Sequence, residues 1–164
     1  MELRQLKDVQ PELASAIDMQ IDLLDAQRRV QARVPLPWSQ TDRVWLTAQI
    51  AAGRPVVRFG DIPIDWTEFR LSLRQTADIL RRHEALEHDD HQRILALARS
   101  ADELQPLVTQ WYESTSRAVG AEAPASNAPA AAYTQVLALA IRPFLARSAE
   151  ALEQQGDFST WQRG

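Results

Sequence analysis

All three histidines of the chain, His83, His88 and His91, lie within one short segment that also holds four carboxylates. A zinc-binding HExxH motif needs its second histidine four residues after the first, but His83 and His88 are five apart. Carboxylate-bridged di-iron bundles need a Glu-x-x-His motif on each of two helices, and no second copy exists here. If the segment were one helix, Glu84, His88 and His91 would share a face, which is the one argument for a metal site.

The alternative interpretation of this segment is a solvated acidic junction between two helices, with Asp89 or Asp90 capping the second. It is favoured because runs of charge are usually exposed to solvent. Residues 83–113 hold seven acidic and two basic side chains, in a chain of net charge −4. A more specific hypothesis is that Glu84, Glu87, Asp89 and Asp90 attract an arginine-rich segment of a partner protein.

Other kinds of chemistry find little support in the composition of these 164 residues. The chain has no cysteine, which excludes disulfides, thiolate metal sites and a cysteine nucleophile. Five glycines form no phosphate-binding GxxxxGK[ST] loop, and there is no GxSxG motif. We therefore expect neither an enzyme nor a bound cofactor.

The acidic balance also disfavours non-specific nucleic-acid binding, which needs a basic face. The first eight residues lack the apolar core of a secretory signal. The longest apolar stretch, Val136 to Ile141, is far shorter than the roughly 20 residues that span a bilayer. The sequence thus predicts a cytoplasmic protein with no nucleic-acid partner and no membrane insertion.

The elements that must position these residues are predicted to be helices, because apolar side chains recur every three or four residues and glycines fall between the patterned segments. We predict one all-α domain over residues 1–164, a bundle of about six helices. Their approximate ranges are 11–32, 41–52, 65 to at least 80, 90–98, 102–119 and 129–155.

Several details of this bundle can be predicted. Asp65 should cap the third helix, with Glu68 three residues later as in a capping box. Residues 136–141 are apolar on every side, so the last helix should be central, and Pro143 should kink it.

The inward faces of two other helices also follow from the spacing of their side chains. In the first helix, Leu13, Ile17, Ile21 and Leu24 should be buried, and in the fifth, the inward residues should be Leu104, Leu107, Val108, Trp111 and Thr115. Trp66 should likewise belong to the core.

Two connecting segments are predicted to behave differently. Residues 54–64 contain prolines and a glycine but also five apolar side chains, which indicates a loop that packs, with a short strand near Val56. Residues 120–131 are rich in alanine, proline and serine and are predicted to be a flexible loop. Trp38 and Trp161 fall outside the helical patterns, and Trp161 is a candidate interface residue.

Three short segments carry a resemblance to a known family. They are Gly-Arg-Pro-Val-Val-Arg-Phe at 53–59, Ala-Ile-Arg-Pro-Phe-Leu at 140–145, and Trp-Gln-Arg-Gly at 161–164. In order and spacing they resemble the FdhE family of formate dehydrogenase accessory proteins. In that family such an ending leads into a Cys-Pro-x-Cys-Gly motif and a rubredoxin-like metal-binding region, and this chain has no cysteine. We therefore expect it to correspond to the helical N-terminal domain alone.

The resemblance implies a chaperone-type role in enzyme maturation. Members of the family bind the catalytic subunit of a respiratory formate dehydrogenase in the cytoplasm, before its export by the twin-arginine route. That subunit is the expected partner, and Arg58, Arg142 and Trp161, which lie in the resembling segments, join the four acidic residues as candidate partner-binding residues.

Two alternatives remain open at this point. One is a metal-dependent protein or enzyme that uses His83, His88 and His91. The other is a scaffold or homodimerisation domain for the missing metal-binding region.

Overall fold

A computed structural model of the chain describes residues 3–36, 43–52, 59–117 and 128–155. Within them it has seven α-helices, two single-turn 3₁₀ helices and no strand, which confirms the predicted all-α class. In chain order the elements are α1 (Leu3–Val9), η1 (Pro11–Leu13), α2 (Ala14–Arg33), α3 (Arg43–Ala51), η2 (Phe59–Asp61), α4 (Trp66–Arg82), α5 (His88–Arg99), α6 (Ala101–Arg117) and α7 (Ala128–Gln155).

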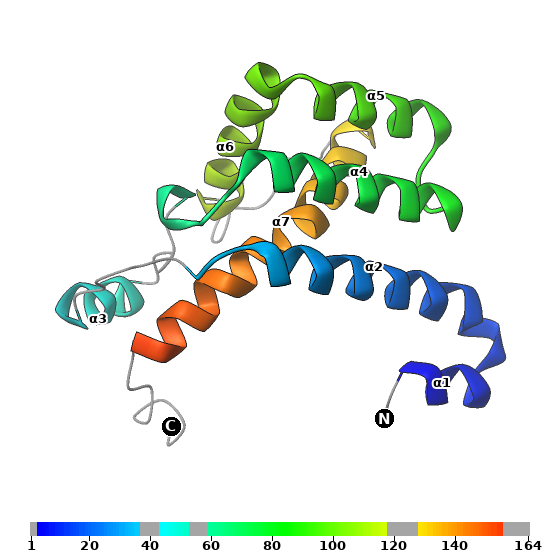
Figure 1. The fold of residues 1–164 in the computed structure, drawn as a ribbon, viewed down its shortest axis with the longest axis horizontal. Helices are drawn as coiled ribbons and strands as arrows, with labels where there is room; N and C mark the ends of the chain where they lie inside the picture. Colours follow the sequence, from blue (N-terminus) through cyan, green and yellow to red (C-terminus); the bar gives the residue numbers. More distant parts are fainter. Residues whose placement is uncertain (1–2, 37–42, 53–58, 118–127, 156–164) are drawn as a thin grey trace.

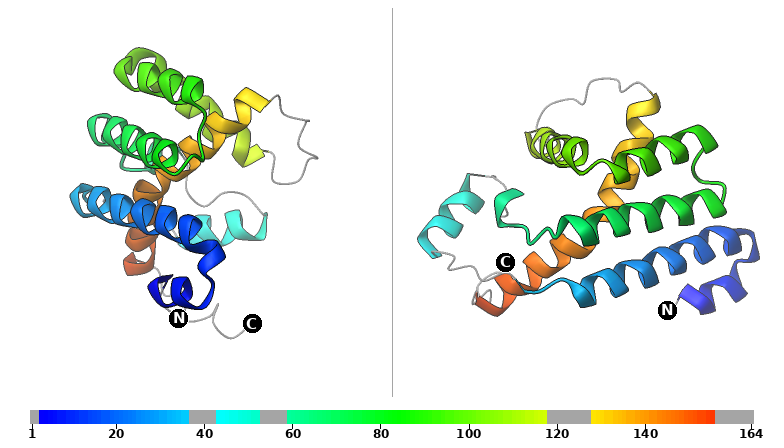
Figure 2. Two further views of the ribbon diagram at one scale, coloured as in Figure 1. Left: turned by 90° about the vertical axis from the view of Figure 1, so that its right-hand side faces the viewer. Right: turned by 45° about the horizontal axis from the view of Figure 1, so that its top comes forward.

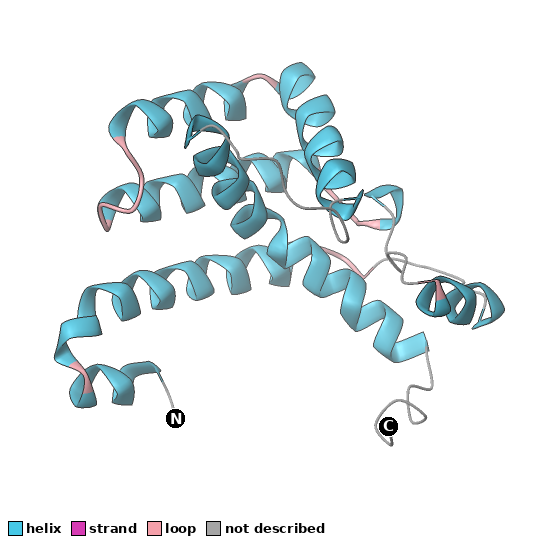
Figure 3. Ribbon diagram, turned by 180° about the vertical axis from the view of Figure 1, so that it is seen from behind, coloured by secondary structure: helices cyan, strands magenta, loops and turns pink. Residues whose placement is uncertain are grey.

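Three helices form a layer, and a fourth crosses it. Helices α2, α4 and α5 lie side by side, with neighbours running in opposite directions and α4 in the middle (Figure 1). Helix α7 packs across one face of this layer and contacts all three (Figure 2). Seen from behind, α7 runs diagonally over α4 and α2 (Figure 3). Helix α1 folds back along α2 on the side away from α4.

The core lies where α7 crosses the layer. The central residues of α7 are at most 2 % exposed: Val136, Leu137, Ala140, Ile141 and Phe144. The rings of Phe69 on α4 and Phe144 lie 5.7 Å apart. The Ser72 hydroxyl on α4 donates to the Ala140 carbonyl at 2.9 Å, which pairs a buried polar group. The buried position predicted for the apolar centre of the last helix is thus confirmed, and α7 continues past Pro143 to Gln155.

The start of α4 is set by its predicted cap. An Asp65 carboxylate oxygen accepts hydrogen bonds from the Thr67 and Glu68 amides at 2.8 and 3.1 Å. These amides have no partner within the helix, so the side chain replaces the missing acceptor. Helix α4 then buries residues at a spacing of three or four: Phe69, Ser72, Leu73, Thr76, Ala77, Ile79 and Leu80.

The N-terminal region departs from the prediction in two ways. Helix α1 was not predicted, because its seven residues show too few apolar repeats. On α2 the buried residues are Ile17, Leu23, Ala26 and Val30. Leu13 is exposed, and Ile21 and Leu24 are only partly buried. Of the predicted stripe only Ile17 is buried, because Leu13 lies in η1 and Ile21 and Leu24 line a groove beside Leu3 of α1.

Helices α5 and α6 also differ in detail from their predicted forms. Helix α5 begins at His88 rather than Asp90, with Glu87 in the capping position and no side-chain cap bond. The predicted cap at Asp89 or Asp90 was therefore wrong. On α6, Leu104 and Val108 are buried and Trp111 packs against the core, whereas Thr115 is exposed and was wrongly placed inward.

The predicted packing of the loop before α4 is confirmed where it is described. Ile62 is buried, and Phe59 and Ile64 pack against the core. The Phe59 ring lies 5.6 Å from Tyr112 and 6.4 Å from Trp66, which also packs against the core as predicted. Residues 128–131 of the predicted flexible loop belong to α7, which begins at Ala128. The remainder of that loop, the strand near Val56, and Trp38 lie outside the described residues.

Within the described part of the chain, no helix combines the length and apolar character that crossing a bilayer requires.

Candidate functional site

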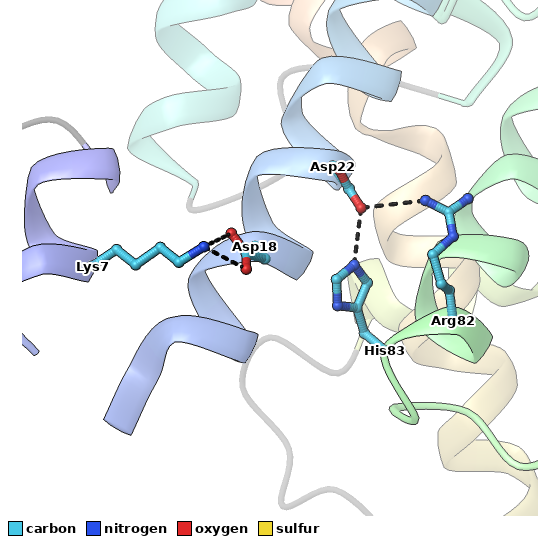
Figure 4. A network of polar contacts seen from close by, with 5 residues as sticks. All are labelled: Lys7, Asp18, Asp22, Arg82 and His83. Carbon is cyan, nitrogen blue, oxygen red and sulfur yellow. Dashed lines mark hydrogen bonds and ion pairs between the residues drawn. The ribbon is translucent and has the colours of Figure 1, made fainter. Parts of the chain in front are cut away.

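His83 does not join the other histidines. It follows the last residue of α4, and its Nε2 lies 2.9 Å from Oδ2 of Asp22 on α2. The His83 side chain is 15 % exposed and that of Asp22 is 40 % exposed, so this contact is partly shielded from water. The same Asp22 oxygen lies 3.4 Å from Nη1 of Arg82 (Figure 4). His83 therefore connects the end of α4 to α2.

The other two histidines lie on α5 and are separated from His83 by a turn. His91 Nε2 lies 2.7 Å from Oδ1 of Asp78 on α4, and its side chain is 12 % exposed. His88, the first residue of α5, is exposed. The single helix on which the metal argument depended is absent, because the chain turns between residues 83 and 87. Among the described residues, no three histidine, aspartate or glutamate side chains gather as metal ligands would.

That turn has the geometry of a Schellman helix end. Glu84 has φ of 58°, and its amide donates to the Arg81 carbonyl at 3.1 Å. The Ala85 amide donates to the Leu80 carbonyl at 2.8 Å. These bonds satisfy two carbonyls at the end of α4. Leu86 is buried in the core and anchors the turn.

The four acidic candidates are brought together near this turn but are not equivalent. Glu84, Glu87 and Asp89 are exposed, and we call these three residues the acidic turn. Asp90 is partly buried and lies 3.4 Å from Nη1 of Arg93, so it is less accessible. Asp89 and Asp90 lie in the first turn of α5, where carboxylates also stabilise the helix dipole.

The other candidate residues lie elsewhere. Arg142 is exposed on α7. Arg58 and Trp161 fall outside the described residues.

The structure adds a feature that sequence reasoning missed, a cleft of about 290 Å³ between α2 and α4. Its two walls have the same residue spacing. Helix α2 contributes Asp22, Asp25, Ala26 and Arg29, and helix α4 contributes Gln75, Asp78, Ile79 and Arg82. On each helix these residues stand at positions i, i+3, i+4 and i+7, which lie on one face. Ala26 and Ile79 are buried at the base of the cleft.

The ionisation of Asp22 is influenced by its neighbours in and beside the cleft. The hydrogen bond with His83 lowers the pKa of the Asp22 carboxyl below its ordinary value, and Arg82 and Arg29 add to this effect. Desolvation of the Asp22 carboxyl acts in the opposite direction and is second in size only to the His83 hydrogen bond. One turn earlier on α2, Lys7 Nζ binds both carboxylate oxygens of Asp18 at 2.8 and 2.7 Å and so attaches α1 (Figure 4).

One polar atom in this wall is left unsatisfied. Gln75 Oε1 is buried and has no hydrogen-bond partner in the structure. Buried amide oxygens nearly always accept a hydrogen bond, because leaving one unpaired costs about 1–3 kcal/mol. The wall of the cleft therefore contains a buried acceptor without a donor.

Comparison of the chain with protein-family models, with curated proteins and with solved structures finds no match.

Proposed function

We propose that this chain is a chaperone-type accessory protein that binds the catalytic subunit of a formate dehydrogenase. Binding would take place in the cytoplasm, while that subunit acquires its cofactor and before it is exported. The proposal starts from the resemblance of residues 53–59, 140–145 and 161–164 to the FdhE family. The work would be protein binding, with no reaction and no cofactor of the chain's own.

The resembling segment that the structure describes has a clear role in the fold. Ala140, Ile141 and Phe144 are buried where α7 crosses the layer, and only Arg142 of this segment is exposed. A likeness in these residues therefore favours a shared helical fold. Arg142 is the residue of this segment that a partner can reach.

The acidic turn is the observation that best supports a docking role. Its three carboxylates stand on a backbone fixed by Leu86 and by the bonds that end α4. Arg81 Nη1 also donates to the Leu86 carbonyl at 3.3 Å. Fixed charges of one sign speed the capture of an oppositely charged partner. The acidic turn is thus suited to a basic segment of a client.

The test uses the purified chain and the purified catalytic subunit of the formate dehydrogenase from the same organism. The two should form a complex that elutes together from a sizing column. In the triple variant Glu84→Lys, Glu87→Lys and Asp89→Lys, association should slow at low salt and the difference should shrink as salt rises. A matched control reverses three exposed acids elsewhere, with Asp8→Lys, Glu12→Lys and Glu113→Lys.

The outcomes separate two claims. Equal association of both triple variants would remove the acidic turn from the docking surface. Failure of the unaltered chain to bind the subunit would refute the proposed function itself.

A further inference from the structure

Helix α1 is attached to the rest of the molecule by few apolar contacts. It folds back along α2 on the side away from α4 (Figure 1). None of its residues is buried, and Leu3 and Leu6 are only partly buried. Because hydrophobic stabilisation is proportional to the apolar area that is removed from water, it is small for this helix.

The connection between α1 and α2 interrupts the helical backbone. Gln10 lies between the two helices with φ of −132° and ψ of 78°, which are not helical values. Pro11 follows it and has no amide hydrogen, so it cannot donate the helical bond to the carbonyl four residues earlier. Rotation at Gln10 can therefore move α1 without unfolding α2.

One ion pair joins α1 to α2 across this connection. Lys7 Nζ lies 2.8 and 2.7 Å from the two carboxylate oxygens of Asp18 (Figure 4). Among the described residues, no other side chain of α1 forms a hydrogen bond or ion pair with α2. The two side chains are 41 % and 45 % exposed. An ion pair this exposed changes an equilibrium by about fivefold at most, so the attachment is reversible.

The face of α2 beside this ion pair is apolar. Ile21 and Leu24 are partly buried and line a groove of about 350 Å³ together with Leu3 and Arg4 of α1. Side chains in a protein core leave no space of this size between them. Helix α1 thus shields Ile21 and Leu24 from solvent without packing tightly against them.

Release of α1 also ends its helical structure. A helix of seven residues is unstable in water when nothing packs against it. We propose that α1 is a releasable strap, which the Lys7–Asp18 ion pair holds over Ile21 and Leu24, and that loss of this pair uncovers both side chains. The strap is a property of the free chain and goes beyond the proposed function, so the two are tested independently.

Hydrogen exchange of the ¹⁵N-labelled chain, followed by NMR, tests the ion pair. The amides of residues 7–10 report on α1, because the first four amides of a helix have no helical acceptor. In Lys7→Gln their protection factors should fall about threefold, whereas those at the centre of α7 should not change. Arg4→Gln is the matched control, because Arg4 is an exposed cation of α1 without a bond to α2. Equal protection of α1 in the two variants would overturn the proposal.

Uncovering of α2 is measured separately from loosening of α1. A soluble paramagnetic probe broadens methyl signals according to their exposure. The methyl signals of Ile21 and Leu24 should broaden more in Lys7→Gln than in the unaltered chain, and those of the buried Leu23 should not change. Unchanged broadening at Ile21 and Leu24 would show that α1 stays in place over α2, and it would also overturn the proposal.

Reversal of both charges tests the two partners. Asp18→Lys should lower the protection of residues 7–10 at least as much as Lys7→Gln, because two like charges then face each other. Adding Lys7→Asp should restore most of the protection. Raising the ionic strength from about 0.01 M to about 1 M should lower the protection in the unaltered chain but not in Lys7→Gln. A double variant without recovery, or an equal response to salt in both chains, would refute the pairing.

Discussion

At the scale of single residues, the most unusual one is Glu84. It occupies the left-handed position that ends α4, where glycine is the common residue because it has no side chain to clash. Holding a non-glycine residue there costs of order 1 kcal/mol. Such positions often coincide with functional surfaces, which agrees with the place of Glu84 in the acidic turn.

We predict that Glu84→Gly stabilises the protein by about 0.5–1 kcal/mol, because it relieves the left-handed backbone without altering any bond of the turn. Urea unfolding measures the change. Glu87→Gly is the matched control: Glu87 has φ of −65° and ψ of 152°, so glycine there should be neutral or destabilising. Equal effects of the two substitutions would contradict the assigned geometry.

A second prediction at this scale concerns acid stability. The native pKa of Asp22 lies below its ordinary value of 3.8, so its carboxylate contributes stability above that value and loses it as pH falls through the native pKa. Asp22→Asn should therefore lose stability relative to the unaltered chain at pH above 3.8, and the gap should narrow as the solution becomes more acidic. Urea titrations over this range measure it. A gap that is constant with pH would show that the His83–Asp22 bond is absent in solution.

At the scale of elements, Arg147 holds α7 against α2. Its Nε donates to the carbonyls of Gln31 and Val34 at 2.9 Å, and its Nη1 binds Glu150 at 2.7 Å. These carbonyls lie at the end of α2, where the regular helical bonds run out, and the Gln31 carbonyl also accepts from the Val34 amide at 3.2 Å. We predict that Arg147→Met lowers the free energy of unfolding by about 1–3 kcal/mol.

Arg142→Met is the control for this substitution, since Arg142 is exposed on the same helix. It should leave stability within about 0.5 kcal/mol of the unaltered chain. If both variants unfold alike in urea, Arg147 does not join the helices as described.

The attachment of α6 can be tested at Trp111. The ring packs against the core and lies 6.5 Å from the Tyr112 ring, but its indole N–H is buried without a partner. Trp111→Ala should destabilise by about 3 kcal/mol, because the residue is only partly buried. Trp111→Phe keeps most of the packing and removes the unpaired donor, so it should cost far less. A near-neutral Trp111→Ala in thermal unfolding would mean that α6 is oriented differently.

The sequence predicted those parts of the fold that depend on neighbouring residues. Asp65 caps α4 through amides two and three residues away, so the start of α4 could be read locally. The apolar centre of α7 was predictable because every face of it is apolar. The start of α5 was not predictable, since Glu87 takes the capping position without a side-chain hydrogen bond.

The parts that could not be predicted depend on residues far apart in the chain. His83 and His91 bind Asp22 and Asp78, and neither partner is adjacent in sequence. The cleft depends on α2 lying against α4. A signal for it did exist, because the two helices share the order of a polar residue, an aspartate, an apolar residue and an arginine at the same spacing. This shared order predicts a cleft only if the two helices are known to lie against each other.

At the scale of the whole molecule, the acidic turn and the cleft belong to the same layer of helices. Asp22 lines the cleft and binds His83, which directly precedes the turn at Glu84. Asp78 lines it too and binds His91 on α5. A client that docks on this layer could therefore contact both features. Helix α7 packs across one face of the layer.

The central claim is that a client protein docks on the layer formed by α2, α4 and α5. Hydrogen exchange on the complex with the formate dehydrogenase catalytic subunit tests this claim most directly. We predict that binding slows exchange of the backbone amides in residues 84–90, while the buried centre of α7 changes little. Absence of a complex, or protection confined to surfaces away from the α2–α4–α5 layer, would contradict it.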